Sequence, residues 1–199
     1  MEDTNYPSLC QSKRNAIADS IHATIEEFSN HLPQEKESLC FFYASLGMDL
    51  CTLVYRNVFQ KQEIYYALQC GKLSVRVNPN PNISGQGLNF GANGVALEEG
   101  NFHCWVIGPC TIAQLIQPCE FIDFTSRFYK ENSIKQGFKW KRKDIGNYIW
   151  IEGQDKLAKT GISFDVNEPF TQKALRDWSV NPLGSIMLKN AVSAYQKLI

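Results

Sequence analysis

The chain has 199 residues, of which 44% are hydrophobic and 20% are charged, enough for one domain with its own apolar core. Its 20 Lys and Arg side chains balance 20 Asp and Glu side chains, so the formal net charge is zero. This balance excludes a highly charged disordered chain and gives no support for nucleic-acid binding through a basic surface. We predict a single domain over 1–199, with a flexible arm at 1–10, a catalytic core at 33–125 and a C-terminal extension at 126–199.

Seven scattered cysteines, an odd number without any CxxC pair, indicate reduced thiols and therefore a cytoplasmic protein. The start, MEDTNYPSLC, is acidic and polar and does not have the pattern of a secretory signal. The apolar stretch 39–55 is shorter than a membrane span and carries Asp49 near its middle, so we expect a buried helix and no membrane partner.

Helical spacing of apolar residues predicts a first helix at 13–32, which Pro33 ends,. Ser38 is the expected N-cap of the second, buried helix, which runs to about residue 59. The pattern then becomes rich in β-branched and aromatic residues, with a bend expected at Gly71-Lys72 and a turn at Gly108-Pro109,. The Asn, Gly and Pro residues of 78–94 predict a long, mobile loop.

The remaining elements are expected in this order: strands at 101–108 and 119–125, a short helix at 126–137, a strand at 147–153, and helices at 169–178 and 183–199. Helices come first, then strands that look antiparallel, then helices again. Without a regular βαβ alternation, this order predicts an α+β fold.

His103 is the histidine best placed for chemistry, because it lies in the apolar segment FHCWVIG and its ring nitrogens need partners there. Asp123, in the next strand-like segment FIDFT, is the expected acceptor and would fix the imidazole tautomer. Cys40 lies in the first turn of the buried helix, where free N–H groups and the helix dipole favour a thiolate. Cys104 is expected to point to the opposite face of the strand from His103, and the six other cysteines are expected to be packing thiols.

The ordered segments LCFFYASL, FHCWVI and EFIDFT resemble the transglutaminase-like branch of the papain-like cysteine protease superfamily. In that branch a Cys opens a helix with Tyr-Ala three residues later, and His-x-Trp-Val and Ile-Asp strands follow. The layout is also similar to that of uncharacterised bacterial members. The resemblance implies a Cys40–His103–Asp123 triad, on a Cys-bearing helix packed against an antiparallel sheet. It covers roughly residues 38–125.

The chemistry expected from this triad is hydrolysis or acyl transfer on a peptide, another amide or a small acyl substrate, with no metal or organic cofactor. The Cys40 backbone N–H would stabilise the oxyanion. Gln34, six residues upstream, matches the place where papain-type enzymes have a Gln that donates a second hydrogen bond. Glu37-Ser38-Leu39 differs from the Arg-Gly-Gly that precedes the Cys of arylamine N-acetyltransferases, so coenzyme A is not expected.

Three other interpretations of these residues compete with the triad. The same fold could be a catalytically silent binding module, with Cys40, His103 and Asp123 serving only as packed or hydrogen-bonded core residues. A zinc site from His103, Cys104, Cys110 and Cys119 is disfavoured by the spacing of its ligands. The basic run KWKRKD at 139–144 is more typical of a solvated face than of a nucleic-acid site.

Overall fold

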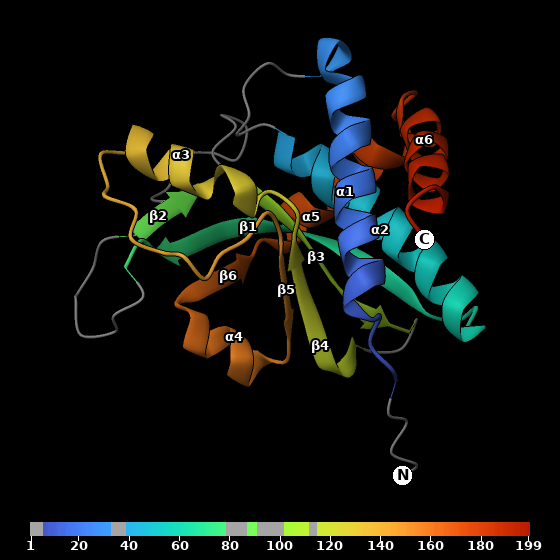
Figure 1. The fold of residues 1–199 in the computed structure, drawn as a ribbon, viewed down its shortest axis with the longest axis horizontal. Helices are drawn as coiled ribbons and strands as arrows, with labels where there is room; N and C mark the ends of the chain where they lie inside the picture. Colours follow the sequence, from blue (N-terminus) through green and yellow to red (C-terminus); the bar gives the residue numbers. More distant parts are fainter. Residues whose placement is uncertain (1–5, 33–38, 79–86, 91–101, 112–114) are drawn as a thin grey trace.

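A computed structural model of the chain describes residues 6–32, 39–78, 87–90, 102–111 and 115–199. Figure 1 shows an α+β fold in which helices surround an antiparallel sheet. The strands are β1 Tyr65–Arg76, β2 Gly87–Phe90, β3 His103–Cys110, β4 Leu115–Asp123, β5 Ile149–Glu152 and β6 Ile162–Val166. The helices are α1 Gln11–Glu27, α2 Cys40–Phe59, α3 Tyr129–Lys135, α4 Gln154–Thr160, α5 Glu168–Ser179 and α6 Gly184–Gln196. Short 3-10 turns lie at Ser29–His31 and Ser126–Phe128.

The sheet has the strand order β2-β1-β3-β4-β5, and β6 pairs with the second half of β1. The first half of β1 pairs with β3, which places Cys70 opposite Cys104 and Gly71 opposite His103. Because β3 and β4 are antiparallel, the start of β3 and the end of β4 lie at the same end of the sheet. This end is where the site is found.

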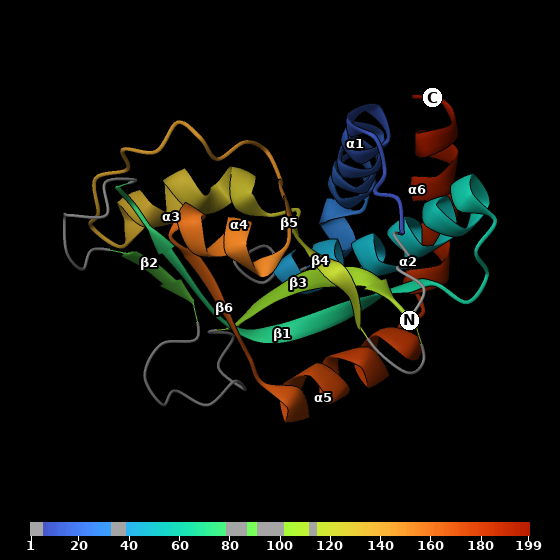
Figure 2. The ribbon, with the colours of Figure 1, turned by 90° about the horizontal axis from the view of Figure 1, so that it is seen from below.

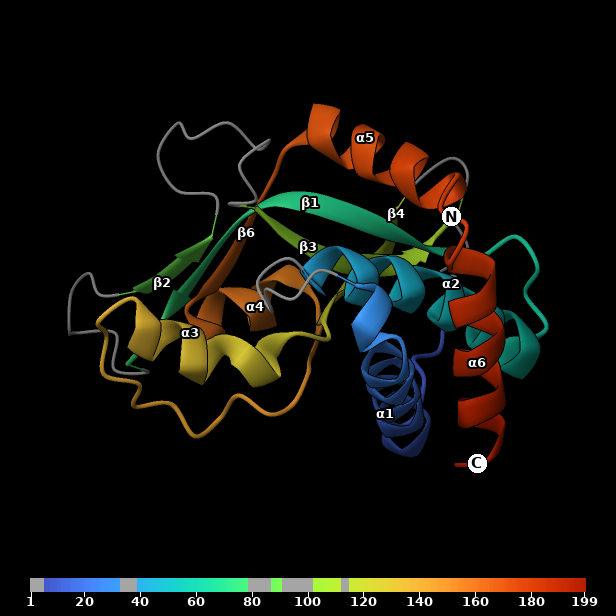
Figure 3. The ribbon, with the colours of Figure 1, turned by 90° about the horizontal axis from the view of Figure 1, so that it is seen from above.

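The helices form layers on the sheet, as Figures 2 and 3 show from opposite sides. Helix α2 lies against β1 and β3, and α1 and α6 pack on its outer side. Helix α5 runs beside the first half of β1, where Thr171 Oγ1 accepts a hydrogen bond of 3.0 Å from the backbone N–H of Cys70. This side chain partners a backbone group that would otherwise be exposed at a sheet edge.

Two apolar cores stabilise this arrangement. One lies between the sheet and the helices α1, α2, α5 and α6, and α2 fits it because its apolar residues surround the helix,. The other contains Trp105 of β3, Phe121 of β4, Tyr129 of α3 and Leu157 of α4. Alternation along β3 sends Cys104 and Val106 to the first core and Trp105 to the second,.

The predicted helices and most of the predicted strands are confirmed, but four local expectations are wrong. Residues 87–90 are a strand with Leu88 and Phe90 buried, not part of a mobile loop. The neighbouring ranges 79–86 and 91–94 lie outside the described residues. β1 continues without a break at Gly71-Lys72, because the missing side chain of Gly71 lets the Asp165 carbonyl of β6 approach: an added Cβ would lie 2.1 Å from that oxygen.

A turn was expected at Gly108-Pro109, but these two residues are part of β3. The pairing of β3 with β4 shifts register between Gly108 and Cys110. The arm expected at 1–10 is not loose in its described part, since Leu9 is buried and Tyr6 packs on the core. Two elements were not predicted, α4 and β6. The stretch 126–199 is more than an extension of the core, because β5 and β6 complete the sheet.

Within the part of the chain that the structure describes, no helix is long and apolar enough to cross a membrane. Asp49 of α2 instead accepts a hydrogen bond of 2.8 Å from the Trp178 indole of α5. The carboxylate in the middle of the apolar stretch thus joins two helices.

Candidate active site

Three elements bring Cys40, His103 and Asp123 together at one end of the sheet. Cys40 is the first residue of α2, His103 is the first residue of β3 and Asp123 is the last residue of β4. The Nε2 atom of His103 lies 2.6 Å from Oδ2 of Asp123. Cys40 and His103 line the same cavity, close enough that each shifts the pKa of the other, and the Cys40 thiol donates a long hydrogen bond of 3.8 Å to the Phe102 carbonyl. Since Nε2 is engaged by Asp123, Nδ1 is the ring nitrogen left for Cys40. The three predicted catalytic residues therefore converge in the expected order.

Asp123 is fully buried and is held by several donors besides His103. The backbone N–H and the hydroxyl of Thr125 donate to Oδ1 at 2.7 and 2.6 Å. The Tyr129 hydroxyl donates to Oδ2. Burial alone would raise the pKa of this carboxyl, but the charge and hydrogen bond of His103, with these donors, lower it below its ordinary value,. Asp123 is thus a fixed anion aimed at the imidazole.

The His103 ring is buried between Phe90 of β2 and Tyr129 of α3, whose ring centroids lie 5.2 and 6.2 Å away. Burial alone would lower its pKa. The Asp123 carboxylate and the hydrogen bond to Cys40 outweigh this effect and raise the pKa of His103 to about 10. The imidazolium is therefore the favoured form at neutral pH.

Cys40 is an activated thiol in this setting. A hydrogen bond donated by the Cys104 thiol has the largest effect, and the His103 imidazolium adds to it, so the pKa of Cys40 falls to about 5 despite burial. Cys40 also occupies the N1 position of α2, where no side chain of the described residues caps the helix, and the dipole favours an anion. The N-cap position is Leu39, one residue later than the predicted Ser38.

Cys104 is the functional residue that the sequence analysis missed. Its thiol bonds to Cys40 on one side, and its Sγ lies 2.8 Å from Sγ of Cys70 on the other. Burial raises the pKa of Cys104 well above its ordinary value, so it remains a thiol and acts as a donor. Cys51, on the same helix as Cys40, is buried without an activating partner, and burial raises its pKa too.

The cavity at the nucleophile is small. Its lining residues come from α2, β2, β3 and the segment 125–132: Cys40, Phe90, His103, Thr125, Phe128, Tyr129 and Asn132. Its volume is about 10 Å³, close to the smallest that holds a water molecule. The described lining therefore leaves room for about one small group.

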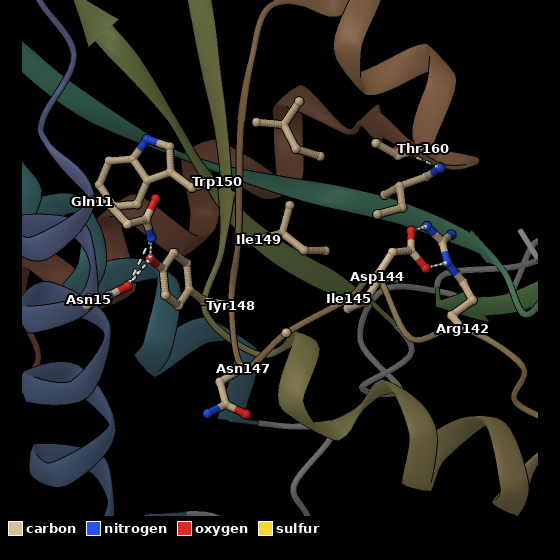
Figure 4. Close-up of a pocket in the computed structure, with 13 residues that line it drawn as sticks. Gln11, Asn15, Arg142, Asp144, Ile145, Asn147, Tyr148, Ile149, Trp150 and Thr160 are labelled. Carbon is tan, nitrogen blue, oxygen red and sulfur yellow. Dashed lines mark hydrogen bonds and ion pairs between the residues drawn. The ribbon is translucent and has the colours of Figure 1, made fainter.

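Two larger cavities lie away from the triad. Figure 4 shows one of them, which is lined by Gln11 and Asn15 of α1 and by Tyr148. Its volume is about 390 Å³. The Gln11 amide donates to the Tyr148 hydroxyl, and that hydroxyl donates to Asn15 Oδ1, both at 2.6 Å. The other, about 400 Å³, is lined mainly by 126–130 and 140–147. Arg142 of the basic run is buried and paired with Asp144, so this residue is not part of a solvated face.

Gln34, the predicted second oxyanion donor, lies outside the described residues. The four residues weighed as a zinc site do not act together: His103 is bonded to Asp123, Cys104 to Cys40, and Cys110 and Cys119 belong to the second core. Among the residues that the structure describes, no group of three or more His, Cys, Asp or Glu side chains could hold a metal ion.

Comparison with known proteins supports the fold and goes no further. No protein-family model and no curated protein matches the chain. Among solved structures, the chain is similar to the crystal structure of genomics APC5867, at 14% identity and a TM-score of 0.57, over 96% of this chain and 80% of that one. At this identity the similarity concerns the α+β fold alone.

Proposed function

We propose that the protein is a cysteine-dependent hydrolase or acyl transferase that acts on an amide or ester through Cys40, His103 and Asp123. The observation that carries the proposal is the buried, hydrogen-bonded His103–Asp123 pair that shares a cavity with the Cys40 thiol, whose pKa is strongly lowered. A perturbed nucleophile beside a base that a third group orients is the pattern of nucleophilic catalysis.

The reaction proceeds in two balanced steps. The Cys40 thiolate attacks the carbonyl carbon, and a C–S bond forms as the bond to the leaving amine or alcohol breaks. The His103 imidazolium gives its proton to that leaving group. Water, or an acceptor nucleophile, then attacks the thioester while His103 takes its proton, and the Cys40 thiolate is regenerated. The Cys40 backbone N–H is one of the free donors in the first turn of α2,, and in this proposal it stabilises the oxyanion of both steps.

The resemblance to the transglutaminase-like branch of the papain-like enzymes agrees with this proposal. The flanking motif residues have local structural roles: the Tyr43 hydroxyl bonds to His22 at 2.6 Å, and the Trp105 indole donates to Gln69 at 3.2 Å. We propose a papain/transglutaminase-like fold and a cytoplasmic location, where the seven thiols stay reduced,.

A catalytically silent binding module is the second candidate. The observation in its favour is the burial of the site, since Cys40 and His103 are each only 2% exposed. On this alternative the hydrogen-bonded chain only stabilises the junction of α2, β3 and β4.

Acyl-enzyme formation separates the two. Incubation with p-nitrophenyl acetate should give a burst of p-nitrophenolate and an acetyl thioester on the Cys40 peptide. Cys40→Ala should lose both, and the matched variant Cys51→Ala should keep both, because Cys51 is a buried thiol of the same helix. No adduct on Cys40, in a folded protein that acylates only the exposed Cys10, would favour the binding module.

A further inference from the structure

A buried asparagine that the triad does not use lines the same cavity. Asn132 lies on α3, is only 4% exposed and lines the cavity together with Cys40 and His103. Its Oδ1 atom is buried and accepts no hydrogen bond from any described residue. A buried acceptor without a donor destabilises the folded protein, so its place beside the nucleophile requires an explanation.

The position of Asn132 follows from the geometry of α3. Tyr129 and Asn132 are three residues apart, so they share one face of the helix. Tyr129 uses this face to bond to Asp123, and the same contact holds Asn132 at the cavity. The next residue, Ser133, is also buried with an unpartnered hydroxyl, but it is not among the residues that line the cavity.

We infer that Asn132 determines the substrate class: its Oδ1 accepts a hydrogen bond from the N–H of an amide group held beside Cys40. The site therefore takes amides in preference to esters. This inference rests on the proposed function. An ester has an oxygen where the amide has N–H, so an ester leaves the buried Oδ1 unpaired, and sites that bind through such a hydrogen bond discriminate against analogues without it.

The test uses two alkylating reagents that differ at one position. N-methyl-2-iodoacetamide and methyl iodoacetate have the same shape, with N–H in the first where the second has oxygen. Alkylation rates of each cysteine are measured at pH 7 by peptide mass spectrometry. The amide-to-ester rate ratio at Cys40 is divided by that at the exposed Cys10, which corrects for the intrinsic reactivity of the reagents.

We expect this normalised ratio to be about 3 to 10, the effect of one net hydrogen bond. It should fall to about one in Asn132→Ala and stay high in the matched control Ser133→Ala. Asn132→Asp keeps an acceptor oxygen at the same place, so its ratio should also stay high although its absolute rates fall with the added charge. Removing an unpartnered group should not lower the melting temperature of Asn132→Ala.

A normalised ratio of about one in the wild type, or a high ratio that persists in Asn132→Ala, would overturn the inference. Its failure and that of the proposed function are distinguishable. If Cys40 reacts fast with both reagents but without preference, only the role of Asn132 is wrong. If Cys40 reacts no faster than Cys10 with either reagent, the activated thiol itself is wrong, and the inference falls with it.

Discussion

Removing the negative charge of Asp123 tests whether this carboxylate, acting through His103, keeps the Cys40 thiol ionised. In Asp123→Asn the amide keeps the size of the carboxylate and an acceptor for Thr125, but it no longer supplies the negative charge that keeps His103 protonated. Burial alone lowers the pKa of His103, so the imidazole should become neutral. Cys40 then loses its cationic partner, and we expect its pKa to rise.

The magnitude follows from the pKa of Cys40, which is about 5 in the native protein. Loss of an adjacent opposite charge shifts a pKa by about 1–3 units. A rise of about two units would reduce the thiolate at pH 5 from about half of the molecules to about one in a hundred. Alkylation of Cys40 should therefore slow by about 50-fold at pH 5 and much less at pH 8.

The assay is the iodoacetamide rate at Cys40 from pH 4 to pH 9, measured by peptide mass spectrometry. Tyr129→Phe is the matched control, because it removes one hydrogen bond to the same carboxylate and keeps the charge. Its midpoint should move by less than about one unit. A folded Asp123→Asn protein with an unchanged Cys40 midpoint would refute the reasoning.

Two further predictions concern the thiol pair and the sheet. Cys104→Ala should raise the midpoint of Cys40 alkylation by about one unit, because it removes the hydrogen bond with the largest effect on that thiolate,. Cys70→Ala, which removes the thiol next to that of Cys104, should change the midpoint less. An unshifted midpoint in Cys104→Ala would contradict this. Gly71→Ala should destabilise the fold by about 1–3 kcal/mol, because its Cβ meets the Asp165 carbonyl,. The control is Gly146→Ala, where the nearest atom to an added Cβ is 3.9 Å away. In a thermal melt, the Tm of Gly71→Ala should be several degrees lower than that of the control. Equal Tm values for the two variants would contradict the close approach of β6 to Gly71.

The triad could be predicted because its signals are local. Each of the three residues can be recognised from the sequence immediately around it. The Cys opens an apolar helix, and the His and the Asp lie on successive strand-like segments. Antiparallel pairing then brings the start of β3 and the end of β4 together. The ordered pattern of the three motifs was therefore sufficient to select the site.

The role of Cys104 could not be predicted, although strand alternation placed it on the correct face. Its contact with Cys40 depends on how α2 crosses β3, and no local pattern specifies that crossing. Asn132 has an even weaker signal, because it is one polar residue in a short helix whose orientation is set by the contact of Tyr129 with Asp123.

The missed strands have different causes. The segment at 162–166 is short, but its residues Ile, Ser, Phe, Asp and Val alternate between apolar and polar, a local strand signal that the prediction did not use. Its position on β1 allows the close approach at Gly71. The Gly-rich flanks of 87–90 favoured a loop, whereas pairing of Leu73 with Phe90 makes it a strand. In this second case a long-range contact overrides the local preference.

The central claim is that Cys40 is an activated nucleophile, and the pH dependence of its alkylation in the native protein tests it most directly. Each of the seven thiols would be followed by mass spectrometry with iodoacetamide from pH 4 to pH 9. We expect Cys40 to react with a midpoint of about 5 and, below pH 7, faster than the exposed Cys10. A Cys40 that is unreactive at pH 6, or that reacts only as the pH approaches the ordinary pKa of a thiol, would contradict it.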